Sequence, residues 1–223
     1  VGFQDDGRAR GIAVHWEGGR WVRHDPPRPT SGGMVLSAVD VDPAGRVWVV
    51  GQQVSDSAAR TGLVLERRAG AWHRRAVPVG RGSGFTSVRA IAPDNVWVAG
   101  SRLTNHGIRP IVGHWNGATW TMETITAAGD DAVLSGIAGN ASSDLWAAGW
   151  TTRNGRAEPL VLHRDATGWK VADPPDFGGL YTLLADVSVD AEGRPWVVGG
   201  VYRDTVDFYV PVAARLDGAT WTN

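Results

Sequence analysis

The sequence has no cysteine and a single lysine, Lys170, among its 22 basic residues. The lack of cysteine excludes disulfide bonds, thiolate metal ligands and a cysteine nucleophile. No run approaches the roughly 18 apolar residues that a membrane helix needs. Basic and acidic residues nearly cancel, at 22 against 23, for a net charge of −1. We therefore expect neither nucleic-acid binding nor membrane insertion.

Tryptophan and glycine, in contrast, are abundant and periodic, with 12 and 30 copies in 223 residues. One tryptophan series consists of Trp48, Trp97, Trp146 and Trp196, with spacings of 49, 49 and 50 residues. A glycine stands three residues after each of them. A second series alternates with the first and consists of Trp21, Trp72, Trp120, Trp169 and Trp221. A β-branched residue stands nine positions before each member of the first series. The sequence is therefore a repeat with a period of about 49 residues.

Each repeat contains four strand-like pieces joined by turns. The first alternates in polarity, as in residues 36–41 and 134–138, and the second is the apolar Trp-containing run. The third piece is exemplified by residues 63–67 and 111–115, and the fourth contains the tryptophan of the second series. Tight turns join the third piece to the fourth. Four antiparallel strands in each repeat predict an all-β fold, a β-propeller with one four-stranded blade per repeat.

We expect one propeller domain over residues 1–223, trimmed at both ends. Five blades is the simplest closed count, because five 49-residue repeats need 22 residues more than the sequence has. Part of a six- or seven-bladed ring is the alternative.

These motifs resemble those of secreted bacterial β-propellers with Asp/Asn-x-Val/Leu-Trp blades, which are similar to kelch and sialidase-like propellers. Residues 116–120 and 217–221 look like worn sialidase Asp-box turns without the leading serine. The arginine-rich composition looks actinobacterial, and the five-blade arithmetic is similar to that of tachylectin-type propeller lectins. The resemblance implies a secreted, extracellular protein, and such modules occur in large toxin assemblies.

Catalytic and metal motifs are weak. His15, His114 and His163 share one repeated slot, but equivalent slots fall on different blades, so we expect no metal site and no cofactor. The aspartates at 40, 42, 186 and 190 are expected to make turns rather than calcium loops. No Gly-x-Ser-x-Gly is present, so we expect no enzyme activity. A sialidase-like site would need several arginines, and Arg102, Arg109, Arg153, Arg156 and Arg203 lie in loops.

Ligand binding is the function that the sequence favours. The loops that join the strands vary most between repeats, and function is grafted on such loops. Trp150 belongs to neither tryptophan series and could stack on a sugar, unless it only covers a loop. The expected binding residues are Trp150, Tyr202, Tyr181, Asp130, Asp131 and Gln53. We predict a carbohydrate-binding module of a larger secreted protein, with glycan as partner. A protein-interaction scaffold and a glycosidase-like enzyme are the alternatives.

Overall fold

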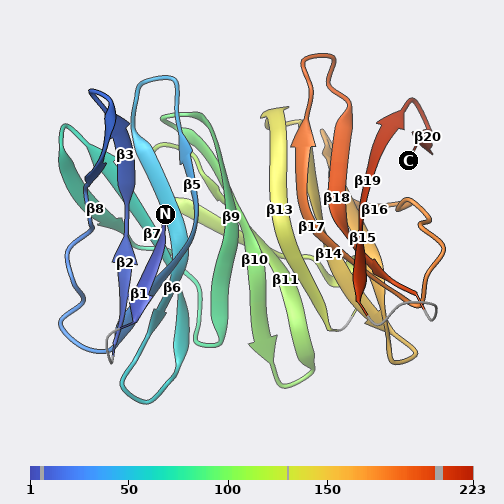
Figure 1. Ribbon diagram of the computed structural model, residues 1–223, viewed down its shortest axis with the longest axis horizontal. Coiled ribbons are helices and arrows are strands. Elements are labelled where there is room, and N and C mark those ends of the chain that lie inside the picture. Colours follow the sequence, from blue (N-terminus) through green and yellow to red (C-terminus); the bar gives the residue numbers. More distant parts are fainter. Residues whose placement is uncertain (6–7, 130, 204–207, 223) are drawn as a thin grey trace. The chain divides into compact units, whose positions relative to one another are not determined.

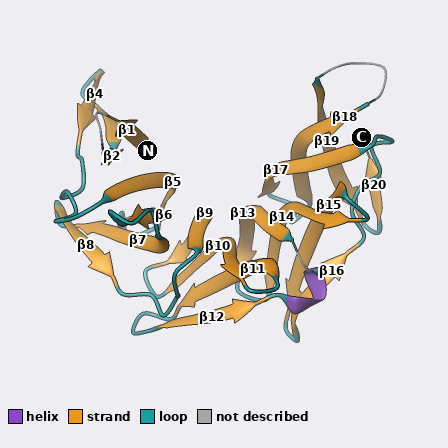
Figure 2. Ribbon diagram, turned by 90° about the horizontal axis from the view of Figure 1, so that it is seen from below, coloured by secondary structure: helices purple, strands orange, loops and turns teal. Residues whose placement is uncertain are grey.

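The computed structural model describes residues 1–5, 8–129, 131–203 and 208–222. These contain twenty strands and one short 3-10 helix, η1 (Thr126–Ala128), which precedes β13 (Figures 1 and 2). Within the described residues, no helix is long and apolar enough to cross a bilayer. The predicted all-β fold is confirmed.

The first repeat forms two small ladders rather than one sheet. β1 (Gly2–Asp5) pairs with β2 (Ala9–Ile12), and β3 (Val14–Glu17) pairs with β4 (Arg20–Arg23). The stretch from β2 to β3 corresponds to the third strand of the other repeats and is interrupted at Ala13.

Each of the other four repeats forms a four-stranded antiparallel sheet in chain order. The strands of the first two sheets are β5 (Gly33–Val41), β6 (Val47–Val54), β7 (Arg60–Arg68), β8 (Ala71–Arg75), β9 (Ser83–Ala92), β10 (Asn95–Thr104), β11 (Gly107–Trp115) and β12 (Trp120–Thr124). Those of the last two are β13 (Ala132–Ala141), β14 (Asp144–Arg153), β15 (Arg156–Asp165), β16 (Gly168–Ala172), β17 (Tyr181–Val189), β18 (Pro195–Tyr202), β19 (Tyr209–Asp217) and β20 (Thr220–Thr222). The four predicted strand pieces of each repeat are confirmed in these sheets.

The repeated glycine of the second strand has a steric cause. The first strand of three sheets carries a one-residue register shift, between Leu36 and Ala38 in β5 and at the equivalent places in β13 and β17. This bulge presses the backbone of the first strand against the second. A Cβ on Gly51 would lie 2.9 Å from Cα of Leu36, and Gly149 and Gly199 meet the same obstacle. Glycine recurs at this position because the backbone of the first strand leaves no room for a Cβ.

The second strands are buried on both faces where sheets adjoin. Trp48, Val49 and Val50 of β6 have no exposed surface, and the Trp48 ring lies 6.3 Å from that of Trp115 and 6.4 Å from that of Trp120. Trp16 and Trp21 hold the slots of Trp115 and Trp120 in the first repeat and are 55% and 65% exposed. Trp196, in the slot of Trp48, is 40% exposed.

The repeated histidine slot is explained by stacking on the second strand. The rings of Trp97 and His114 lie 4.1 Å apart, and those of Trp146 and His163 lie 4.0 Å apart, both nearly parallel. In the last sheet Arg215 takes this place over Trp196 at 5.3 Å, a cation–π contact.

The predicted aspartate turn is also present. The carboxylate of Asp42 accepts the amide hydrogens of Ala44 and Arg46 at 2.9 and 3.0 Å, and the indole N–H of Trp48 at 3.1 Å. These donors engage both oxygens, as expected for a turn.

Contacts divide the chain into two compact units. The first comprises Val1–Val98 and His114–Met122, and the second comprises Ala99–Gly113 and Glu123–Asn223. The boundary runs through strands β10 and β11. The single domain over residues 1–223 and the count of five blades stay predictions.

Candidate functional site

A cavity of about 400 Å³ lies in the second unit, where β15 begins and where the segment between β16 and β17 passes. We call it the Asp173 cavity. Its apolar wall includes Pro174, Phe177 and Leu180, and its polar groups include Arg153, Arg156, Glu158, Asp173, Asp176 and Thr182. The cavity volume is within the range of about 300–1,000 Å³ usual for small-molecule sites.

The segment that forms one wall is fixed by hydrogen bonds at several points. The indole N–H of Trp221 donates to the carbonyl of Asp173 at 2.8 Å, and Arg203 donates to the carbonyl of Phe177 at 3.1 Å. Phe177 itself is 8% exposed and packs in the core cluster between β15 and β17. Because the protein's own groups hold the wall in place, ordering it on binding costs little.

Both signs of charge line the Asp173 cavity. Arg153 and Glu158 form an ion pair at 3.8 Å, and the side chain of Asp176 accepts the amide hydrogen of Gly178 at 2.8 Å. Arg156 and Asp173 are exposed at the same cavity. Guanidinium donors beside carboxylate acceptors suit a ligand whose groups both donate and accept, such as a hydroxyl.

Trp150 lies next to this cavity and is half-buried. Its cross-strand partner on β15 is Pro159, which lines the cavity. Thr151, the next residue along β14, also lines the cavity, so Trp150 adjoins lining residues along the chain and across the strands. Trp150 is not among the lining residues, and its role in binding stays a prediction.

Tyr181 and Tyr202, two of the expected binding residues, lie side by side. They are cross-strand partners on β17 and β18 with rings 6.0 Å apart, and Tyr209 on β19 continues the row at 5.8 Å. Thr182, one residue after Tyr181, lines the cavity. Since side chains alternate along a strand, this tyrosine row lies on the face opposite Thr182.

The other expected binding residues lie elsewhere. Asp131 accepts the amide hydrogen of Ile108 at 3.0 Å through its side chain, and so stabilises the start of β11. Gln53 is half-buried on β6 of the first unit, between Met34 and Thr61 of the neighbouring strands. Asp130 lies outside the described residues.

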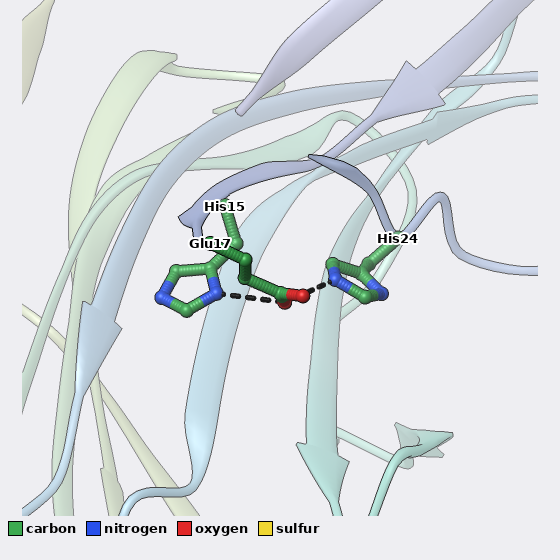
Figure 3. A group of neighbouring side chains, drawn as sticks. All are labelled: His15, Glu17 and His24. Atoms are coloured by element: carbon green, nitrogen blue, oxygen red, sulfur yellow. Dashed lines mark hydrogen bonds and ion pairs between the residues drawn. The ribbon is translucent and has the colours of Figure 1, made fainter. Parts of the chain in front are cut away.

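The structure also brings together His15, Glu17 and His24, which the sequence analysis did not connect. His15 and Glu17 share one face of β3, and His24 follows β4 on the same side. One oxygen of Glu17 is 2.9 Å from Nδ1 of His15 and 2.6 Å from Nε2 of His24 (Figure 3). Hydrogen bonds from the two histidines lower the pKa of Glu17 below its usual value.

These three side chains could supply metal ligands, since their ligand atoms lie within 4.8 Å of one another. A second contact argues for a hydrogen-bonded triad. Arg67 lies 3.2 Å from Nδ1 of His24, and because a guanidinium can only donate, Nδ1 accepts and Nε2 carries the proton toward Glu17. A metal on Nε2 would require that proton to move to Nδ1, against the guanidinium.

No protein-family model matches the sequence, and no curated protein sequence matches it. Two solved structures are similar in fold. A protein of unknown function from Dyadobacter fermentans matches with a TM-score of 0.66 and 14% identity, over 96% of this chain and 66% of that one. An α-L-arabinanase from Penicillium chrysogenum, complexed with arabinobiose, matches with a TM-score of 0.51 and 12% identity, over 82% of this chain and 63% of that one.

The four-stranded sheets are β-propeller blades. The predicted blade architecture is thus confirmed, and identities this low carry the fold alone. The chain spans less than two thirds of the length of these two relatives.

Proposed function

We propose that this chain is a carbohydrate-recognition module that binds a neutral oligosaccharide in the Asp173 cavity. The observation that carries the proposal is the cavity itself, which combines an apolar wall at Pro174 and Phe177 with clustered donors and acceptors. A sugar presents apolar C–H faces and hydroxyl groups together, and therefore needs such a mixed lining.

The placement of the cavity supports a binding role. Its polar groups come from the β14–β15 turn and the β16–β17 segment, which are among the stretches that vary most between repeats. Variable loops on a repeated scaffold are where recognition is grafted. One structural relative was solved with arabinobiose, a disaccharide, which supports a saccharide as the class of ligand.

A glycosidase is the second candidate, because the carboxylates of Glu158, Asp173 and Asp176 line one cavity and glycoside hydrolysis uses a carboxylate pair. We place binding without catalysis first. Glu158 is ion-paired with Arg153, and Asp176 is bound to the Gly178 amide, so both carboxylates have structural partners.

We further propose that the module belongs to a larger secreted protein, with a cell-surface or free glycan as partner. Support comes from the resemblance of the blade motifs to secreted bacterial propellers. A protein-docking scaffold is the alternative, and the same experiment separates the two.

Calorimetric titration of the chain with arabinobiose and a panel of neutral oligosaccharides tests the proposal. Removing one hydrogen-bonding side chain with Arg156→Ala or Glu158→Ala should weaken binding about tenfold. The matched control is Arg102→Ala, an exposed arginine on β10 outside the cavity, which should bind as the unaltered chain does. Trp150→Ala should weaken binding less than the cavity variants, because it adjoins the cavity.

Three results would overturn the proposal. Binding that survives both cavity variants would place the site elsewhere. Turnover of an aryl glycoside, lost in Glu158→Ala, would make the chain a glycosidase. The absence of binding to any glycan, together with tight association with a protein partner, would make it a scaffold.

A further inference from the structure

A second cavity, of about 310 Å³, lies in the first unit among β1, β2, β4 and the segment that leads into β5. We call it the Asp25 cavity. The buried side chain of Met34 and the ring of Pro26 supply its apolar surface, and Arg10, Arg23, Arg28 and Asp25 supply its charges.

The two cavities occupy the same place in the repeat. Every residue that lines the Asp25 cavity has a counterpart 148 positions later that lines the Asp173 cavity, except that the counterpart of Gln4 is 147 positions later. The triplet Asp-Pro-Pro stands at 25–27 and at 173–175, and nowhere else in the sequence. In both places the second-series tryptophan of the following repeat donates its indole N–H at 2.8 Å to a carbonyl of the segment, Trp72 to His24 and Trp221 to Asp173. The Asp25 cavity is therefore the structural equivalent of the Asp173 cavity in another repeat.

The charges of the two cavities differ at matched positions. Arg10 stands where the other cavity has Glu158, and Arg28 stands where it has Asp176. Arg23 replaces the uncharged Val171, while Asp25 matches Asp173. The Asp25 lining thus has three arginines and one carboxylate, whereas the Asp173 lining has two arginines and three carboxylates.

The single carboxylate of the Asp25 cavity is already engaged. One oxygen of Asp25 accepts the amide hydrogen of Ala13 at 3.1 Å, and the other accepts Nε–H of Arg23 at 2.9 Å. It offsets the charge of Arg23, and the lining as a whole contains two more arginines than carboxylates. Arginine pairs with carboxylate or sulfate through two parallel hydrogen bonds.

We propose that the Asp25 cavity is a second saccharide site that takes an acidic sugar, one carrying a carboxylate or sulfate group. The inference rests on the proposed function for the choice of a sugar, and on the charge exchange for the choice of an acidic one. The chain then holds two equivalent cavities, one for a neutral and one for an acidic saccharide.

The test is calorimetric titration of the chain with digalacturonate, with its neutral methyl ester and with a sulfated disaccharide. We expect digalacturonate or the sulfated disaccharide to bind, and the methyl ester to bind at least tenfold more weakly at this cavity. The double variant Arg10→Glu, Arg28→Asp, which gives the cavity the acidic residues of its counterpart, should weaken acidic-sugar binding about tenfold or more for each arginine. Arg28→Asp alone provides a milder variant, since Arg28 is exposed. The matched control is Arg156→Ala in the Asp173 cavity, which should leave acidic-sugar binding unchanged.

The outcomes separate the two proposals. Neutral oligosaccharides that bind while neither acidic sugar does would overturn this inference and leave the proposed function standing. Acidic sugars that bind equally to Arg28→Asp and to the unaltered chain would also overturn it. Inorganic sulfate that competes as well as the disaccharides would show an anion site without sugar recognition. Failure of every saccharide to bind would overturn both proposals.

Discussion

Replacing Gly51 by alanine tests the steric account of the glycine period. The added Cβ would lie 2.9 Å from Cα of Leu36, and nearer still to the carbonyl oxygen of Val35. Ordinary contacts of a Cβ begin near 3.4 Å, so the backbones of β5 and β6 must separate by about 0.5 Å to clear Cα of Leu36 and by more to clear the oxygen of Val35. Both obstacles are main-chain atoms in a paired strand and cannot rotate away. Overpacking of about 1–3 kcal/mol, with one weakened ladder hydrogen bond of about 1 kcal/mol, gives a destabilisation of roughly 3 kcal/mol.

The control is Gly2→Ala, in the same repeat slot and the same compact unit. Among the described residues, nothing lies within 4 Å of a Cβ at Gly2, which is on β1 in the two-stranded ladder with β2. Its effect should stay within about 0.5 kcal/mol. Urea unfolding followed by tryptophan fluorescence measures both variants. Equal midpoints for Gly51→Ala and Gly2→Ala would refute the steric account, since the two differ mainly in the opposing backbone.

Two further predictions concern packing and charge. Trp48→Ala should lower the free energy of unfolding by about 3–5 kcal/mol, because it empties a fully buried site beside Trp115 and Trp120. Trp21→Ala should change the free energy of unfolding far less, because the Trp21 side chain is 65% exposed. Equal effects of the two variants in urea unfolding would contradict the packing assigned to Trp48. Hydrogen bonds from Lys170 and then from Thr167 hold the pKa of Asp165 well below its usual value of 3.8, so the stabilisation by this group is present above about pH 4 and declines as the pH falls below it. Lys170→Met should raise the pKa of Asp165 in an NMR titration of the side-chain carboxyl, and an unchanged pKa would show that Lys170 is not the main cause.

The fold was predictable because the periodic residues make contacts that recur in several of the sheets. Trp48 fills the space between two sheets, Gly51 admits a bulge, and His114 stacks on Trp97. Such contacts depend on the strand pairing alone, so they leave the same residue type at the same interval. The exposure of Trp21 and Trp196 could not be read from the period, because a repeated position does not show how much of its side chain the rest of the structure covers.

The candidate site was less predictable, because it is made by segments that do not repeat. Trp150 stood out as an aromatic residue outside both series, yet the cavity beside it is lined by arginines, carboxylates and prolines. Residues 151–160 of one sheet and residues 171–182, which lead into the next sheet, meet to form it, and single-residue features do not report such a meeting. Likewise, His24 joins His15 and Glu17 only through the pairing of β3 with β4.

The signal that could have located the cavities is a repeat within the variable loops. Asp-Pro-Pro recurs 148 residues apart, while the repeats between have Ala76-Val77-Pro78 and Thr124-Ile125-Thr126 at the corresponding place. Two prolines restrict the backbone of this linking segment, and the indole N–H groups of Trp72 and Trp221 donate to the carbonyls of His24 and Asp173 at its start. A rigid segment of this kind keeps the same course whatever its neighbours are, which allows Glu158 and Asp176 in one copy to be Arg10 and Arg28 in the other. The shared backbone and the exchanged charges together argue that the two cavities differ in ligand rather than in construction.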